Sequence, residues 1–220
     1  MSAVLGLTTH RFSRAQYERM VEAGVFEPND RLELLDGEII DMAPRKSRHA
    51  TAVTLVGDTL RTIFGPGVTV RVQLPFSLDD HSEPEPDVAV VPGSPRDYRD
   101  AHPSRAFLVC EVADTTRAYD RGRKLAAYAR AGISEYWILD LIGETLEVCR
   151  KPAGGRIYRA AGHVCECADF APGHIRATHR SPGIAALRSS DDSSLGPGAP
   201  CGSDFSPTQP PRQSRNPLSG

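Results

Sequence analysis

Three short apolar runs constrain most strongly what this chain can fold into. They are "DVAVV" at 87–91, "AFLVCEVA" at 106–113 and "EYWILDL" at 135–141. Runs of this length that are rich in Val, Ile and Leu are typical of buried strands. Further strands are predicted at 68–78, 145–150 and 156–159. The sequence therefore predicts a buried sheet, in which a carboxylate is unfavourable unless it is paired or functional.

Helices are predicted between and before these strands. Ser13 and Gln16 have the spacing of a capping box at a helix start. Apolar residues at helical spacing predict an amphipathic helix over 47–64. A third helix is expected to begin with Asp120 as its N-cap and to end at Gly132.

The order of these elements defines the fold class. Asp36-Gly37 lies between two apolar-rich runs and predicts a two-residue hairpin turn. Helix, hairpin, helix, strands, helix and strands then follow one another along the chain. This order predicts an α/β fold, with a mixed α+β sheet and few helices.

Length and composition indicate one globular domain with appendages. Of 220 residues, 40% are hydrophobic and 25% are charged. We expect a flexible N-terminus at 1–11, a domain over 12–178 and a disordered Ser/Pro/Gly-rich tail at 179–220. The net charge of −2 means that attraction to nucleic acid requires a local basic patch. Without an apolar run long enough for a span or a signal peptide, a cytoplasmic protein with no membrane partner is expected.

Two acidic residues lie in the apolar strands. Asp87 opens one strand and Glu111 lies inside or at the end of another. An unpaired buried carboxylate costs several kcal/mol, so each residue is either paired or functional. Strands lie about 4.8 Å apart, so carboxylates at neighbouring strand ends can share one cation. Two salt-bridged strand-end acids are the alternative.

A basic group follows these acids. Lys124 comes after Arg121 and Arg123, which fall in the first turn of the predicted third helix. Cations there oppose the helix dipole, and a bound phosphate at the helix start would explain them. A plain solvated basic face is the alternative. Two carboxylates and a lysine near a phosphate suit metal-assisted phosphodiester hydrolysis.

Three longer stretches carry a family resemblance. "LELLDGEII", "SEPEPDVAVV" and "EVADTTRAYDRGRKLAAYARAGISEYWILDL" together resemble the Uma-two family, classed with restriction endonucleases in the PD-(D/E)XK superfamily. The resemblance covers roughly residues 12–160. It implies a restriction-endonuclease-like core, with a central mixed sheet flanked by helices. It also implies dependence on a divalent metal, for which Mg²⁺ or Mn²⁺ is expected, and nucleic acid as the substrate.

The resemblance assigns roles residue by residue. Pro86-Asp87 matches the family's "PD" and Glu111 its "D/E", so Asp87 and Glu111 are the expected metal ligands. Ala113 stands where the superfamily pattern has its lysine, and Lys124 on the following helix is the match. The expected catalytic residues are therefore Asp87, Glu111 and Lys124.

Four more polar residues keep two interpretations each. Glu33 matches an acid of the family's first hairpin, and is either an additional ligand or a structural support. Asp120 matches another recurrent acid, and helix capping is its alternative role. His49 fits a surface or capping position better than a phosphate contact. Gln73 either lines the pocket or is an exposed strand residue.

These observations predict a divalent-metal-dependent DNA endonuclease. One alternative is a catalytically silent nuclease-fold protein that serves as a nucleic-acid-binding or interaction module. Another is a metal-dependent hydrolase of small phosphate esters, which needs no extended basic groove. The sequence leaves the oligomeric state open, a homodimer included.

Overall fold

A mixed β-sheet forms the centre of the protein. The computed structural model describes residues 8–153, 157–160 and 165–166. Within these ranges the strands pair in the order β3-β4-β5-β6-β7-β8, with β9 also paired to β7. Only β5 and β6 run parallel among these described pairs. The strands are β3 (Val68–Val72), β4 (Val88–Pro92), β5 (Leu108–Ala113), β6 (Glu135–Asp140), β7 (Thr145–Ala153), β8 (Ile157–Ala160) and β9 (Cys165–Glu166).

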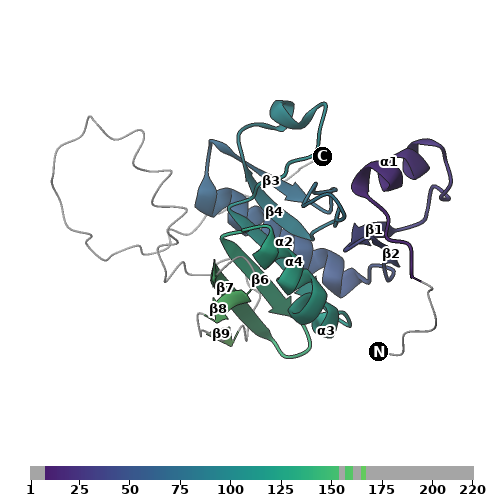
Figure 1. Cartoon of the computed structure of the whole chain (residues 1–220). Helices are drawn as coiled ribbons and strands as arrows, with labels where there is room; N and C mark the ends of the chain where they lie inside the picture. The colour runs from purple at the N-terminus through teal and green to yellow at the C-terminus, as the bar shows by residue number, and fades with distance from the viewer. Residues whose placement is uncertain (1–7, 154–156, 161–164, 167–220) are drawn as a thin grey trace, which may run out of the picture.

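Helices cover the two faces of this sheet (Figure 1). Helix α2 (Ser47–Phe64) packs on one face. The other face carries α4 (Leu125–Arg130). It continues from α3 (Arg117–Tyr119) and the π-helical turn η2 (Asp120–Lys124), which together connect parallel strands β5 and β6. A short 3₁₀ helix, η1 (Pro95–Tyr98), follows β4.

Alternation along the strands creates the two cores. Val88, Val90 and Cys110 point toward α2, whereas Ala89 and Val109 point toward α4. Each fully buried Val contributes about 1.5–3 kcal/mol relative to an exposed one. Neighbouring residues of one strand thus serve opposite cores, and the face of a strand residue decides which helix it meets.

A hairpin and a helix lie beside the sheet, at the right of Figure 1. Strands β1 (Leu32–Leu35) and β2 (Glu38–Asp41) form the predicted hairpin. Its turn residues Asp36 and Gly37 both have positive φ, as this turn requires. Helix α1 (Arg14–Glu22) begins with the predicted capping box. The hairpin contacts the connection between β3 and β4 through an isolated antiparallel bridge between Leu34 and Glu83.

Most predicted elements are confirmed, and two boundaries depart most from the prediction. Residues 47–64 are helical as predicted. The strand predicted over 68–78 ends at Val72, because Gln73 adopts a φ of 49° that breaks the extended backbone. The third helix begins earlier than predicted, because Asp120 already has helical φ and ψ of −66° and −42°. Asp120 is therefore inside the helical segment and is not its N-cap.

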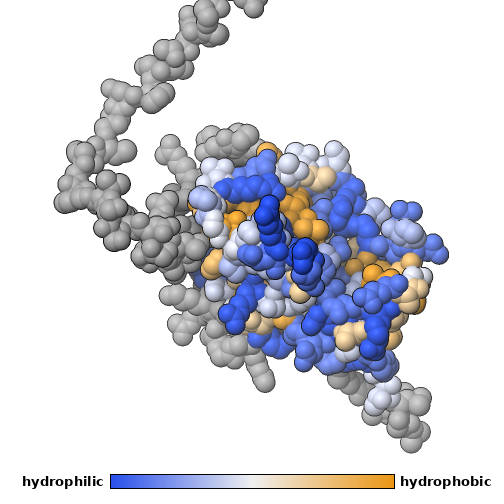
Figure 2. All heavy atoms as spheres, turned by 90° about the horizontal axis from the view of Figure 1, so that it is seen from above, coloured by the Kyte–Doolittle hydropathy of each residue, from blue (hydrophilic) through white to orange (hydrophobic). Residues whose placement is uncertain are grey.

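Some predictions concern residues outside the described ranges. The Ser/Pro/Gly-rich tail at 179–220, the end of the domain at 167–178 and most of the N-terminal segment 1–11 belong there. No helix of the described part is long and apolar enough to cross a membrane. The face seen in Figure 2 is largely hydrophilic, with apolar residues visible in patches.

Candidate active site

The two predicted acids face each other across neighbouring strands. Strands β4 and β5 are antiparallel, and Val88 pairs with Cys110. One step further along this register, Asp87 lies opposite Glu111, and its backbone N–H donates to Glu111 Oε2 at 3.3 Å. Gln73, which follows β3, lies next to Asp87 on the side away from β5, since the Gln73 backbone N–H donates to the Asp87 carbonyl at 3.1 Å. Directly opposed residues share a face, so these side chains gather at one end of the sheet.

Both oxygens of the Asp87 carboxylate accept hydrogen bonds. Oδ1 receives Gln73 Nε2 at 2.9 Å and lies 3.1 Å from His49 Nε2, while Oδ2 receives the Val112 N–H at 2.9 Å. The side chain is 13% exposed. Burial alone would raise the pKa of Asp87, but the bonds from His49, Gln73 and Val112 outweigh it and lower the pKa below its usual value. Asp87 is therefore held ionised in a fixed orientation.

Glu111 is buried more deeply than Asp87, and Lys124 Nζ and the Tyr128 hydroxyl both donate to its Oε1, at 3.1 and 2.9 Å. Burial raises the pKa of Glu111 to about 8. The positive charge of Lys124 opposes this increase, whereas the negative charge of Asp87 adds to it. Its second oxygen, Oε2, accepts the long bond from Asp87 N–H.

Lys124 joins two acids from the helical side of the sheet. Its side chain is 2% exposed, and Nζ lies 3.1 Å from Glu111 Oε1 and 3.2 Å from Glu33 Oε2. Burial alone would lower the pKa of Lys124, but Glu111 and Glu33 outweigh it and raise the pKa well above its usual value. The residue closes the π-helical turn η2, a type of turn often found at functional sites.

Glu33 and Asp120 complete the charged cluster in different ways. Glu33 is fully buried and accepts bonds from the Tyr119 hydroxyl at 3.1 Å and the Glu85 N–H at 3.1 Å. Asp120 accepts the Thr116 hydroxyl at 2.7 Å. Burial raises the pKa of Asp120 to about 6, and the charge of Lys124 opposes this increase. Glu33 therefore contacts the lysine directly, whereas Asp120 acts on it at longer range.

The cations that precede Lys124 do not belong to this cluster. Arg121 pairs with Glu147, and Arg123 pairs with Glu38 at 2.8 Å. Because the helical segment begins at Arg117, neither residue lies in its first turn. The predicted phosphate at the start of this helix is therefore not supported. Only Lys124 of the three basic residues enters the site.

Sequence reasoning underrated His49 and Gln73 and missed two tyrosines. Both His49 and Gln73 contact Asp87. The signal for Gln73 is its place two residues before a proline, where a strand is about to break. Tyr128 lies four residues after Lys124, on the same helix face, so its contact with Glu111 follows from helical spacing. Nothing comparable in the sequence pointed to Tyr119.

The donor set fits a hard divalent cation. Glu33, Asp87, Glu111 and Asp120 all act electrostatically on one buried lysine, and a bound cation would favour the ionised form of Glu111. Across the described ranges, no group of three or more His, Cys, Asp or Glu side chains is arranged as a metal cage. Magnesium commonly uses one or two carboxylates together with water and substrate phosphate. Asp87 and Glu111 suit that mode of binding.

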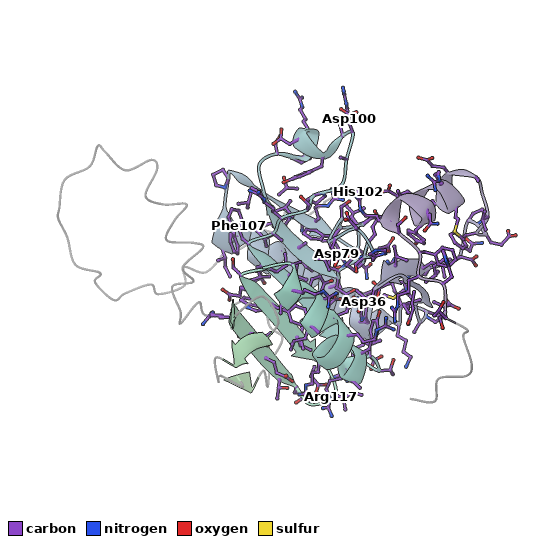
Figure 3. All side chains as sticks on the ribbon, in the orientation of Figure 1. Asp36, Asp79, Asp100, His102, Phe107 and Arg117 are labelled. Atoms are coloured by element: carbon purple, nitrogen blue, oxygen red, sulfur yellow. The ribbon has the colours of Figure 1, made fainter. Side chains whose placement is uncertain are left out.

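A surface pocket lies apart from this cluster. It has a volume of about 1000 Å³ and holds none of the residues of the acidic cluster. Asp36 and Asp79, both labelled in Figure 3, pair there with Arg130. Its lining is Arg11, Asp36, Glu38, Asp79, Asp80, His81, Arg123 and Arg130. Acids and bases of this pocket largely pair with one another.

The mixed sheet, with helices on both faces and a helical crossover between parallel strands β5 and β6, has the architecture of the restriction-endonuclease-like fold. The sequence matches the model of the Uma2 family, described as "Putative restriction endonuclease", over residues 14–166. The chain belongs to this family.

A solved structure supports the fold. A "putative nuclease belonging to DUF820" from Anabaena variabilis ATCC 29413 superposes with a TM-score of 0.51 at 16% sequence identity. The match covers 68% of this chain and 84% of the other. Among curated proteins, none matches this sequence. The predicted resemblance to the Uma-two family is thus confirmed.

Proposed function

We propose that this protein is a divalent-metal-dependent endonuclease that hydrolyses DNA phosphodiester bonds. The observation that carries the proposal is the convergence of Asp87, Glu111 and Lys124. Asp87 N–H reaches Glu111 Oε2, and Lys124 Nζ reaches Glu111 Oε1. Membership of the family described as "Putative restriction endonuclease" supports nucleic acid as the substrate.

Asp87 and Glu111 would hold Mg²⁺ or Mn²⁺. When bound, such a cation activates water as a nucleophile and stabilises negative charge on the phosphate. His49 and Gln73 fix the orientation of Asp87, and Tyr128 fixes that of Glu111. Fixed supporting bonds of this kind typically change metal affinity 10–100-fold when removed.

Lys124 acts through its positive charge. Its Nζ is buried and bonded to two carboxylates, and these keep its pKa high, so it stays protonated at neutral pH. A protonated lysine cannot accept a proton from water. Lys124 therefore positions Glu111 and offsets charge near the phosphate, and it does not serve as a general base.

Cleavage of supercoiled plasmid and of single-stranded DNA tests the proposal. With Mg²⁺ or Mn²⁺ the wild type is expected to cleave, and EDTA is expected to stop it. Asp87→Asn keeps the size of the side chain and is expected to lower the rate at least ~100-fold, since losing a metal-bound charge costs about 3 kcal/mol or more of barrier. Glu83→Gln is the matched control, because Glu83 lies in the same connection and contacts neither Asp87 nor Glu111.

The two alternatives give different results in this assay. A catalytically silent nuclease-fold protein binds DNA without metal-dependent cleavage. A small phosphate ester hydrolase releases phosphate from p-nitrophenyl esters and leaves plasmid intact. If the wild type gives either result, and Asp87→Asn behaves like the wild type on DNA, the endonuclease proposal is refuted.

A further inference from the structure

A basic pair lies beside the carboxylates of the active site. Arg31 directly precedes β1, and Arg45 lies in the loop that enters α2. The loop is fixed against Arg31, since Arg31 Nη1 donates to the Ala43 carbonyl at 2.6 Å and the Met42 N–H donates to the Arg31 carbonyl at 2.7 Å. Two chain segments therefore bring two guanidinium groups to one place.

These two cations are close enough to the acidic cluster to act on it. The charges of Glu85 and Asp87 both act on Arg45, and both arginines act on His49, which contacts Asp87. Partial burial lowers the pKa of Arg45, and the like charge of Arg31 lowers it further. Like charges repel, and an anion bound beside the two arginines would add to the offsetting effect of Glu85 and Asp87.

None of the described residues forms a direct contact with the Arg45 guanidinium that would offset this charge. Within the part of the chain that the structure describes, no carboxylate lies within ion-pair distance of its guanidinium and no hydrogen bond holds it. The neighbouring cations differ, because Lys46 pairs with Asp114 at 3.6 Å and Arg48 donates to the Leu141 carbonyl at 2.7 Å. Arg45 is exposed, forms no ion pair or hydrogen bond with another described residue, and lies four residues before His49, which contacts Asp87.

We infer that Arg45, supported by Arg31, binds a backbone phosphate of the nucleic acid next to Asp87. The inference rests on the proposed nuclease function and adds the residues that hold its substrate. A planar guanidinium binds a phosphodiester through two parallel hydrogen bonds, and it does so without reading the base sequence. The first turn of α2, whose N-terminus has no side-chain cap, directly follows this loop, and its backbone N–H groups add to the positive potential.

Binding of a fluorescein-labelled DNA duplex, followed by anisotropy in EDTA between 50 and 200 mM salt, tests the inference. Arg45→Ala is expected to weaken binding about tenfold at low salt, whatever the sequence of the duplex. The slope of log K against log [salt] is expected to fall by about 0.9, the value for one phosphate contact on duplex DNA. Arg45→Lys keeps the charge and is expected to retain the slope with lower affinity.

The matched control is Arg61→Ala. Arg61 is half exposed and lies in the last turn of α2, so its removal makes the same change in net charge at the far end of the helix. Arg45→Ala is also expected to raise the KM for cleavage and leave kcat within about threefold, because a phosphate contact outside the reacting group binds ground and transition states alike.

The outcomes separate this inference from the proposed function. If Arg45→Ala binds DNA with the affinity and salt slope of Arg61→Ala while the wild type cleaves, the phosphate contact is refuted and the nuclease stands. If the wild type binds DNA and never cleaves it, a tenfold loss in Arg45→Ala upholds the contact and the nuclease fails. A wild type that binds no DNA refutes both. A lower unfolding free energy in Arg45→Ala with an unchanged salt slope shows that Arg45 only offsets Glu85.

Discussion

Removal of the buried lysine should destabilise the protein strongly. Lys124 Nζ lies 3.1 and 3.2 Å from two carboxylate oxygens in a setting where its side chain is 2% exposed. At an effective dielectric constant of 20 each contact has a Coulomb energy of about 5 kcal/mol, most of it offset by desolvation. Breaking such a buried pair costs about 3–5 kcal/mol, since it leaves an uncompensated charge. Lys124→Met should therefore lose about 3–5 kcal/mol of unfolding free energy at pH 8.

Urea unfolding followed by circular dichroism in EDTA measures this loss, with an unchanged m value as the check on two-state behaviour. Arg123→Met is the matched control. Arg123 precedes Lys124 in the same turn but is 37% exposed, so its pair with Glu38 is worth about 1 kcal/mol or less. Adding Glu33→Gln to Lys124→Met should restore part of the loss. If Lys124→Met loses no more unfolding free energy than Arg123→Met, the argument is refuted.

Two further results are expected. Mn²⁺ affinity, measured by calorimetry, should rise up to about tenfold per pH unit between pH 6 and 8, because burial raises the pKa of Glu111 to about 8 and the bound proton must leave. In the metal-free protein the folded state binds more protons than the unfolded one over about pH 5–8, so the unfolding free energy should fall as pH rises. A flat pH profile in both measurements would contradict this expectation. His49→Ala removes a bond to Asp87 and should weaken Mn²⁺ binding about 10–100-fold, whereas His102→Ala, which has no contact with Asp87, should leave it unchanged.

Local patterns in the sequence were enough to predict most of the fold. Alternation and apolar runs located the strands, and Asp36-Gly37 located the hairpin turn. The start of the third helix was missed because Asp120 was interpreted as the N-cap, whereas Thr116, one helical turn earlier, occupies that position. Propensity cannot choose between them, and the packing of Tyr119 against Glu33 favours the earlier start.

The site was predictable only in part, because its residues meet through pairing register and helix placement. Asp87 and Glu111 could be expected at neighbouring strand ends, but their direct opposition depends on the register of β4 and β5. Lys124 is separated from Glu111 by 13 residues, and the π-helical turn that ends at Lys124 has no signature in composition. His49 comes from the opposite face of the sheet, which no local pattern could reveal.

Mn²⁺ binding to the metal-free protein tests the central claim, that Asp87 and Glu111 together hold a divalent cation, most directly. Calorimetry at pH 8 is expected to show one tight Mn²⁺ per chain in the wild type and in Glu83→Gln. Asp87→Asn and Glu111→Gln are each expected to abolish this binding. Wild-type binding that survives both substitutions, or a wild type that binds no Mn²⁺ with or without DNA, would contradict the account.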